Sequence, residues 1–147
     1  MKVKGLLAFL FVSLIANKAQ CDSYDQDLGK QLFYYSSAAY CEELSLLAWE
    51  CGPACNVIKG IDSITMITDI LLSVQGYVAY NSQTQSIYVV FRGTIGKVNT
   101  VEDIDFFKMQ YPGGPEGALV HTGFYETYSA VSDQVITAVN KYLAQHP

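Results

Sequence analysis

Residues 87–94 read Ile-Tyr-Val-Val-Phe-Arg-Gly-Thr, and this stretch decides the fold class. The unbroken run of β-branched and aromatic residues at 87–91 predicts a strand buried on both faces, as in the middle of a sheet covered by helices. Arg92 brings a charge to the end of this strand, and Gly93 permits a backbone turn that is closed to other residues. Thr94 then offers a hydroxyl and an N–H beyond the turn. Donors held there by a rigid strand can stabilise a developing oxyanion.

The residues before this stretch predict a hairpin. Residues 76–80 and 86–91 have strand-like composition and flank a polar segment, 81–85, whose length suits a hairpin loop. Residues 61–74 fit either a helix or a strand, because apolar residues recur there at helical spacing in a segment rich in residues that also suit strands. Gly52 and Pro53 predict a turned loop between two cysteines.

Two amphipathic helices are predicted, one near each end of the chain. The first opens with a capping box at residues 23–26, and its apolar positions are Leu28, Leu32, Tyr35 and Ala39. The second ends before Pro147 and should cover the sheet with one apolar stripe, made of Phe124, Tyr128, Val131, Val135, Ala138 and Tyr142. Residues 111–117, which hold two prolines and three glycines, predict a loop.

Three sequence blocks resemble those of one family. They are Gly76-Tyr77-Val78-Ala79-Tyr80, then Phe91-Arg92-Gly93-Thr94 followed by Asn99 and Asp103, then Val120-His121-Thr122-Gly123-Phe124. In this order they are similar to the class 3 (fungal-type) lipases, secreted serine esterases of the α/β-hydrolase fold. The resemblance covers about residues 24–147. It implies an α/β chain that forms the N-terminal part of an α/β-hydrolase fold, with an incomplete mixed sheet and flanking helices.

The resemblance also implies roles for single residues. Thr94 takes the place of the oxyanion-hole residue. Apolar residues recur every third position after it, which describes a short amphipathic helix, and in the family such a helix resembles a lid over the substrate; these residues are Ile95, Val98 and Val101. Thr100 stands where the family usually has Trp. Arg92 and Asp103 are expected to pair structurally, because a buried guanidinium requires a partner. His121 is expected to be structural, since its family counterpart is not the triad histidine.

The family's nucleophile serine sits in a Gly-x-Ser-x-Gly turn, and no such pattern occurs in these 147 residues. By the strand-then-turn layout of the family, the turn would begin about ten residues past Pro147. Residues 21–147 are therefore expected to be the N-terminal half of the domain, truncated before the nucleophile, with the triad acid and histidine also absent. By themselves they are expected to be inactive.

Residues 1–20 predict a secretory signal peptide. Lys2 and Lys4 precede an apolar run at 6–16, and Ala19 could be the small residue before the cleavage site. The run is too short to span a membrane comfortably. Removing Lys2, Lys4 and Lys18 with this segment takes the formal charge from −5 to −8, which excludes a nucleic-acid partner and an attraction to anionic lipid. We expect a soluble extracellular or lumenal protein of undetermined oligomeric state.

Four cysteines follow the predicted cleavage site, namely Cys21, Cys41, Cys51 and Cys55. An even set in an oxidising compartment predicts two disulfides, and all three connectivities stay open. Secretion favours disulfides over thiolate ligation of a metal, so no metal or other cofactor is expected.

The sequence therefore predicts a carboxylic ester hydrolase that resembles the triacylglycerol lipases, meets a lipid or other ester substrate at an interface, and uses a serine acyl-enzyme when complete. Related esterases of the phospholipase A1 or feruloyl type fit the same scaffold. The alternative from another class is a catalytically inert secreted protein that binds lipid or a partner.

Overall fold

The structure is a computed structural model that describes residues 24–93 and 107–147. The signal peptide predicted for residues 1–20 lies outside the described residues. The elements, in chain order, are α1 (Gln26–Ala38), α2 (Glu43–Leu47), α3 (Pro53–Val57), β1 (Ile61–Asp69), β2 (Val74–Asn81), β3 (Ser86–Phe91), β4 (Lys108–Gln110), β5 (Leu119–His121) and α4 (Thr122–Gln145).

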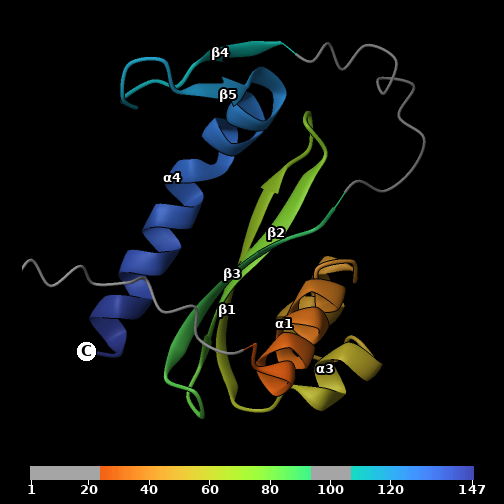
Figure 1. Ribbon diagram of the computed structural model, residues 1–147. Helices are drawn as coiled ribbons and strands as arrows, with labels where there is room; N and C mark the ends of the chain where they lie inside the picture. Colours follow the sequence, from red (N-terminus) through yellow and green to blue (C-terminus); the bar gives the residue numbers. More distant parts are fainter. Residues whose placement is uncertain (1–23, 94–106) are drawn as a thin grey trace, which may run out of the picture.

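The sheet at the centre of the fold has the strand order β1-β2-β3, and both pairings are antiparallel (Figure 1). The hairpin predicted from residues 76–91 is confirmed, with Asn81 opposite Ser86 at its closed end. The open question at residues 61–74 is resolved as strand β1 followed by a turn into β2. Pairing decides this, because β1 hydrogen-bonds to β2 along nearly its whole length, from Ile61 to Asp69.

Helices cover both faces of this sheet, α1 with α3 on one face and α4 on the other (Figure 1). Successive residues of β2 supply the two cores in turn, as strand geometry requires. Tyr77 and Ala79 pack with α1 and α3, while Val78 and Tyr80 pack with α4. The arrangement has three layers, helix, sheet and helix, as in an α/β fold.

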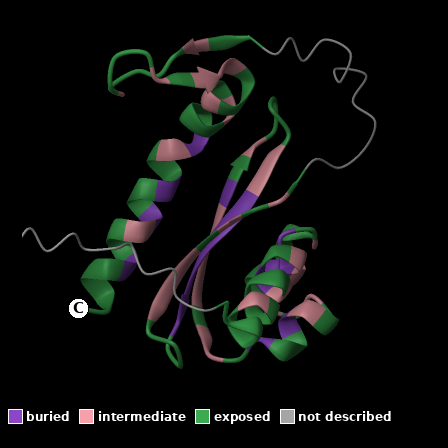
Figure 2. Ribbon diagram, in the orientation of Figure 1, coloured by how far each residue is buried: buried purple, intermediate pink, exposed green. Residues whose placement is uncertain are grey.

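The expectation that residues 87–91 are buried on both faces is wrong. Val89 and Phe91 of β3 are 43% and 39% exposed, whereas every residue of β2 from Gly76 to Asn81 is buried (Figure 2). The reason is position, because β2 has a strand on each side and β3 lies at an edge of the sheet as described. An apolar run predicts a strand but does not say where in the sheet it lies.

Helix α1 differs from its prediction at its start and on its outer face. Asp25 caps it, since its carboxylate accepts hydrogen bonds from the N–H groups of Asp27 and Leu28 at 2.9 and 3.0 Å. Leu28 and Leu32 are exposed. The buried contacts come from the last turns of the helix and the residue after it, at Tyr35, Ala38 and Ala39.

Helix α4 confirms the long C-terminal helix but not the whole of its stripe. Val131, Val135, Ala138 and Tyr142 are buried against the sheet. Phe124 and Tyr128 are exposed, because the first turns of α4 run past the part that packs on the sheet (Figure 2). The loop predicted at residues 111–117 is confirmed as the connection between β4 and β5, a short hairpin that sequence reasoning did not predict.

Candidate active site

Arg92, at the end of β3, is clamped onto the start of β2. Its backbone N–H donates to the carbonyl of Gln75 at 2.8 Å, and its guanidinium Nη1 donates to Gln75 Oε1 at 2.9 Å. Nη2 donates to the carbonyl of Ser73 at 3.2 Å. These bonds hold the strand end that leads to residue 94, so the candidate oxyanion donor follows a fixed backbone.

The pairing of Arg92 with Asp103 stays a prediction, because Asp103 lies outside the described residues. Within those residues the guanidinium is held by Gln75 and Ser73, and its buried Nε has no hydrogen-bond partner there. A buried guanidinium N–H without a partner is costly, so this atom is where a further acceptor would bind.

Gly93 is needed for a reason other than the one predicted. Its φ angle is not in the left-handed region, in contrast to those of Gly52 and Gly60. Instead the Tyr40 hydroxyl lies against it, where it accepts a hydrogen bond from the Gly93 N–H at 3.1 Å. A Cβ added to Gly93 would lie 2.5 Å from that oxygen. A larger residue at position 93 would therefore require the Tyr40 side chain to move, whereas φ sets no demand for glycine there.

Tyr40 and Gln75 are site residues that sequence reasoning missed. Tyr40 follows α1, and Gln75 lies at the start of β2, next to Gly76. The Gln75 amide also donates two hydrogen bonds of 2.9 Å, to the carbonyls of Ala39 and Cys41, and so links α1 to the strand end. Neither residue carries a local signal, because each acts through a partner far away in the sequence.

Thr94 and the predicted lid residues Ile95, Val98 and Val101 lie outside the described residues, so their roles stay predictions. The described part of the site is a hollow of about 310 Å³ beside Arg92, lined also by Gln75, Ser73, Asp69 and Glu43. A larger hollow of about 450 Å³ lies between β1 and α4, away from the end of β3. We assign it no role, because its lining does not include the strand end.

His121 lies at the N-terminus of α4. Its Nδ1 accepts a hydrogen bond from the N–H of Phe124 at 3.4 Å, so the imidazole caps the helix. The ring also contacts the ring of Phe124, with 4.8 Å between centroids.

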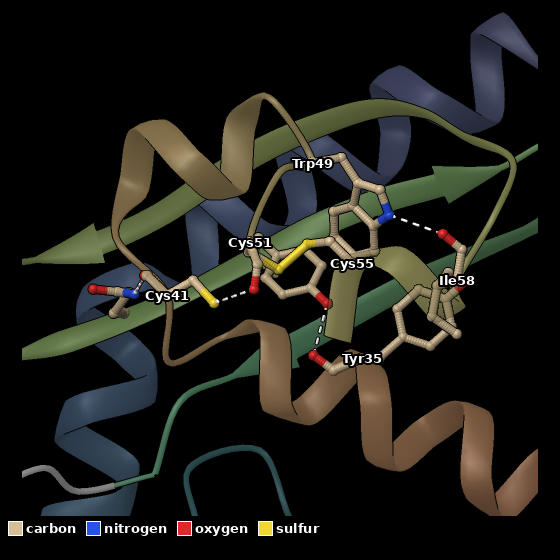
Figure 3. The surroundings of a disulfide bond; sticks show 8 residues. Tyr35, Cys41, Trp49, Cys51, Cys55 and Ile58 are labelled. Atoms are coloured by element: carbon tan, nitrogen blue, oxygen red, sulfur yellow. Dashed lines mark hydrogen bonds between the residues drawn. A yellow bond between two sulfur atoms is a disulfide. The ribbon is translucent and has the colours of Figure 1, made fainter. Parts of the chain in front are cut away.

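Two of the four cysteines are joined, Cys51 to Cys55 across the start of α3 (Figure 3). This confirms one predicted disulfide. Cys41 is bonded to neither of them, and its thiol donates to the carbonyl of Cys51 at 3.5 Å (Figure 3). Cys21 lies outside the described residues, so a second disulfide stays a prediction.

The described groups with shifted pKa values lie under α1 and not at the strand end. Burial raises the pKa of Tyr35 to about 12, and it raises the pKa of Tyr77 further. Both hydroxyls are hydrogen-bonded. The Tyr77 hydroxyl donates to the carbonyl of Tyr35 at 2.8 Å, and the Tyr35 hydroxyl accepts from the side-chain amide of Asn81 at 2.8 Å. These tyrosines belong to the core and not to an acid–base pair.

Residues 24–93 and 107–147 contain no cluster of three or more His, Cys, Asp or Glu side chains that could hold a metal ion. Nor does any helix in this part of the chain have the length and apolar character needed to cross a bilayer.

Several known lipases are similar to this chain in sequence. Residues 88–147 match the family Lipase (class 3). The chain is 31% identical over 113 residues to a lipase of Rhizopus niveus, covering 76% of this chain and 29% of the relative. It is 28% identical over 121 residues to a lipase of Rhizomucor miehei, covering 80% and 33%. A "Secreted mono- and diacylglycerol lipase A" of Penicillium cyclopium is 31% identical over 72 residues, 49% of this chain and 23% of that protein.

Solved structures agree with the sequence matches. A triacylglycerol lipase whose catalytic centre is a serine protease triad superposes with a TM-score of 0.69 at 25% identity, over 85% of this chain and 48% of the other. Lipase II from Rhizopus niveus gives 0.68 at 28% identity with the same coverage. The three-layer fold is thus part of an α/β hydrolase. From residue 88 onward the chain matches the class 3 lipases, and it spans less than half the length of these relatives.

Proposed function

We propose that this chain contributes the oxyanion-stabilising part of a secreted carboxylic ester hydrolase that acts on acylglycerols. The family match at residues 88–147 carries the proposal, since it begins inside β3 and runs through Thr94, His121 and α4. The clamp of Arg92 on Gln75 and Ser73 supports it, because a donor that follows a rigid strand end needs no reorganisation during the reaction.

The chemistry is acyl transfer in two steps. A serine oxygen attacks the ester carbonyl, the alcohol leaves, and water then releases the acid from the acyl-enzyme. In each tetrahedral intermediate the carbonyl oxygen carries negative charge, which the N–H and hydroxyl of Thr94 would stabilise. The nucleophile serine and its triad partners would have to come from residues other than these 147, which hold no Gly-x-Ser-x-Gly turn.

Two further parts of the proposal concern the substrate and the compartment. Ile95, Val98 and Val101 form the apolar side of a lid that meets the acyl chain of a lipid ester. Residues 1–20 direct the protein into the secretory pathway, and two Penicillium relatives are named as secreted lipases. Cleavage is expected between Asn17 and Asp22, and intact-mass analysis of the secreted protein tests it, since retained Met1 would contradict secretion by cleavage.

The transcript gives the first test. A reading frame that continues past Pro147 and encodes Gly-x-Ser-x-Gly within about twenty codons supports the hydrolase, because the family places the nucleophile turn there. A stop codon directly after Pro147 supports the rival function, a catalytically inert binding protein.

Substitution of Thr94 in the extended protein gives the second test. Thr94→Val removes the hydroxyl at constant shape and is expected to lower kcat about 10²- to 10³-fold, the usual loss of one oxyanion donor. Thr94→Ser should restore most of it, since it keeps the hydroxyl. Hydrolysis of p-nitrophenyl butyrate measures both. Equal activity of Thr94→Val and the unmodified protein would exclude the Thr94 hydroxyl as an oxyanion donor, because the variant keeps only the backbone N–H.

A further inference from the structure

The turn that joins β1 to β2 exposes three consecutive apolar residues, Ile70, Leu71 and Leu72, which we name the apolar tip. Ile70 is 94% exposed, Leu71 is 95% exposed, and Leu72 is about half exposed. Turns between strands usually carry Gly, Asn, Asp, Ser or Pro. Single apolar residues on a surface are normal, but three in a row at a protruding turn indicate a contact surface.

Hydrogen bonds hold the apolar tip in a defined shape. The Asp69 carboxylate accepts a bond from the Leu72 N–H at 2.8 Å, and the Ser73 N–H donates to the Ile70 carbonyl at 3.3 Å. Arg92 then ties the base of the turn to the end of β3, through its bond to the Ser73 carbonyl at 3.2 Å. The apolar tip is therefore fixed relative to the strand end that precedes Thr94.

Other exposed apolar residues lie at the same end of the molecule. Val74, just after the apolar tip, packs in the same core cluster as Val131 of α4. The turns of α4 that precede Val131 carry the exposed Phe124 and Tyr128. Figure 1 shows the β1–β2 turn and the start of α4 at one end of the fold, and Figure 2 shows that this turn is exposed.

The negative charge of the protein indicates which kind of surface the apolar tip can contact. The chain carries a formal net charge of −5, and the hollow beside Ile70 is lined by Asp69 and Glu43 as well as Arg92. An anionic lipid surface would be repelled by this balance, whereas burial of Ile and Leu side chains requires no opposite charge. The favoured partner is therefore an apolar surface without net negative charge.

We propose that the apolar tip inserts into the surface of an uncharged or zwitterionic lipid aggregate and thereby presents the end of β3 to that surface. This inference rests on the proposed ester hydrolase function, because the insertion would place the site next to its substrate. It adds an anchor on the rigid β1–β2 turn, separate from the predicted lid at residues 95–101.

Flotation with vesicles tests the proposal without any catalytic step. The secreted chain, without its predicted signal peptide, is mixed with phosphatidylcholine vesicles and, separately, with vesicles containing phosphatidylglycerol. The test variant carries Ile70→Ser and Leu71→Ser. The matched control carries Ile136→Ser and Leu143→Ser, which remove the same two side chains from exposed positions on α4. Far-ultraviolet circular dichroism checks that both variants keep their secondary structure.

The unmodified chain is expected to bind phosphatidylcholine vesicles. The test variant should lose at least about tenfold in partitioning, since it withdraws two large apolar side chains from the lipid, and the control should change by less than about twofold. A Leu71→Trp variant keeps the tip apolar, so it should bind and should show a blue-shifted fluorescence on binding.

Three results would overturn the proposal: no binding by the unmodified chain, an equal loss in the test and control variants, or tighter binding to phosphatidylglycerol vesicles. An equal loss would point to non-specific adhesion. The proposed enzyme function is tested by a separate measurement. The hydrolysis of dissolved p-nitrophenyl butyrate by the extended protein does not require a lipid surface. Vesicle binding by the tip together with no hydrolysis would therefore reject the enzyme and keep the contact.

Discussion

Gly93 shows how one residue is fixed by a partner that is remote in sequence. The Tyr40 hydroxyl occupies the space where a Cβ would stand and accepts a bond from the Gly93 N–H. The glycine and the tyrosine therefore act as one unit, which joins the segment after α1 to the end of β3. If the unit is disturbed, the backbone that leads to Thr94 loses a support.

A double-mutant cycle tests this unit. Gly93→Ala is expected to cost about 1 kcal/mol of unfolding free energy, because Tyr40 must move away and give up its hydrogen bond. In a Tyr40→Phe background the same change should cost clearly less, since the next nearest atom of the ring is 3.7 Å from the added Cβ. Urea unfolding measures all four proteins. Strictly additive costs would show that the two residues do not interact.

The buried tyrosines predict a loss of stability at high pH. Burial raises the pKa of Tyr35 to about 12, against about 10 in the unfolded chain. Below pH 10 the Tyr35 hydroxyl keeps its proton in both the folded and the unfolded chain, so its contribution to the free energy of unfolding is complete. Between pH 10 and 12 the unfolded state binds fewer protons, so the free energy of unfolding falls by at most about 1.4 kcal/mol per pH unit for this group.

Urea unfolding of Tyr35→Phe at pH 9 to 12 measures this effect. The variant should show a smaller fall with pH than the unmodified chain, because it has no proton to lose at this position. Tyr24→Phe, at an exposed tyrosine, is the control and should leave the pH dependence unchanged. A fall that is the same in all three proteins would assign the titration to other groups.

At the scale of elements, side chains of α4 form hydrogen bonds with the outer edge of the sheet, at β1. The Gln134 amide donates to the carbonyl of Thr68 at 3.0 Å and accepts from its N–H at 3.1 Å. These are the two bonds that a neighbouring strand would make. A little further along, Thr65 and Tyr142 share a hydroxyl hydrogen bond of 2.7 Å. The outer edge of β1 is thus partly closed by a helix, which limits pairing with another chain.

Gln134→Leu is expected to cost about 1 kcal/mol in unfolding free energy, because Thr68 is exposed and water replaces part of what the amide supplied. It should also raise self-association, since it frees the β1 edge. The control is Asn140→Leu, an exposed position on the same helix. Urea unfolding and size-exclusion chromatography measure the two effects. If both variants behave alike, the amide does not protect the edge.

At the scale of the whole molecule, the described sheet has an apolar strand at one edge. Val89 and Phe91 of β3 are partly exposed there. The chain also spans less than half of the solved lipases that it matches. The fold of this part matches part of these lipases, and we propose that the catalytic set needs further residues besides these.

The 147 residues by themselves are expected to show no esterase activity. These residues hold no Gly-x-Ser-x-Gly turn, and if the nucleophile lies outside them the oxyanion donor has no tetrahedral intermediate to stabilise. The purified chain is assayed with p-nitrophenyl butyrate against buffer and against the Thr94→Val variant. Turnover above buffer that falls in the variant would show that the nucleophile lies within these residues.

By itself, the sequence determined what depends on neighbours along the chain. The β2–β3 hairpin, the long C-terminal helix and the loop at 111–117 all follow from local periodicity and turn chemistry. Only the tertiary structure decided that residues 61–69 form a strand, that β2 and not β3 is the buried strand, and that Cys51 pairs with Cys55. It also showed that the Tyr40 hydroxyl lies against Gly93 and accepts a hydrogen bond from the Gly93 N–H. These features depend on partners across the sheet, and burial is a property of the assembled layers that no short segment encodes.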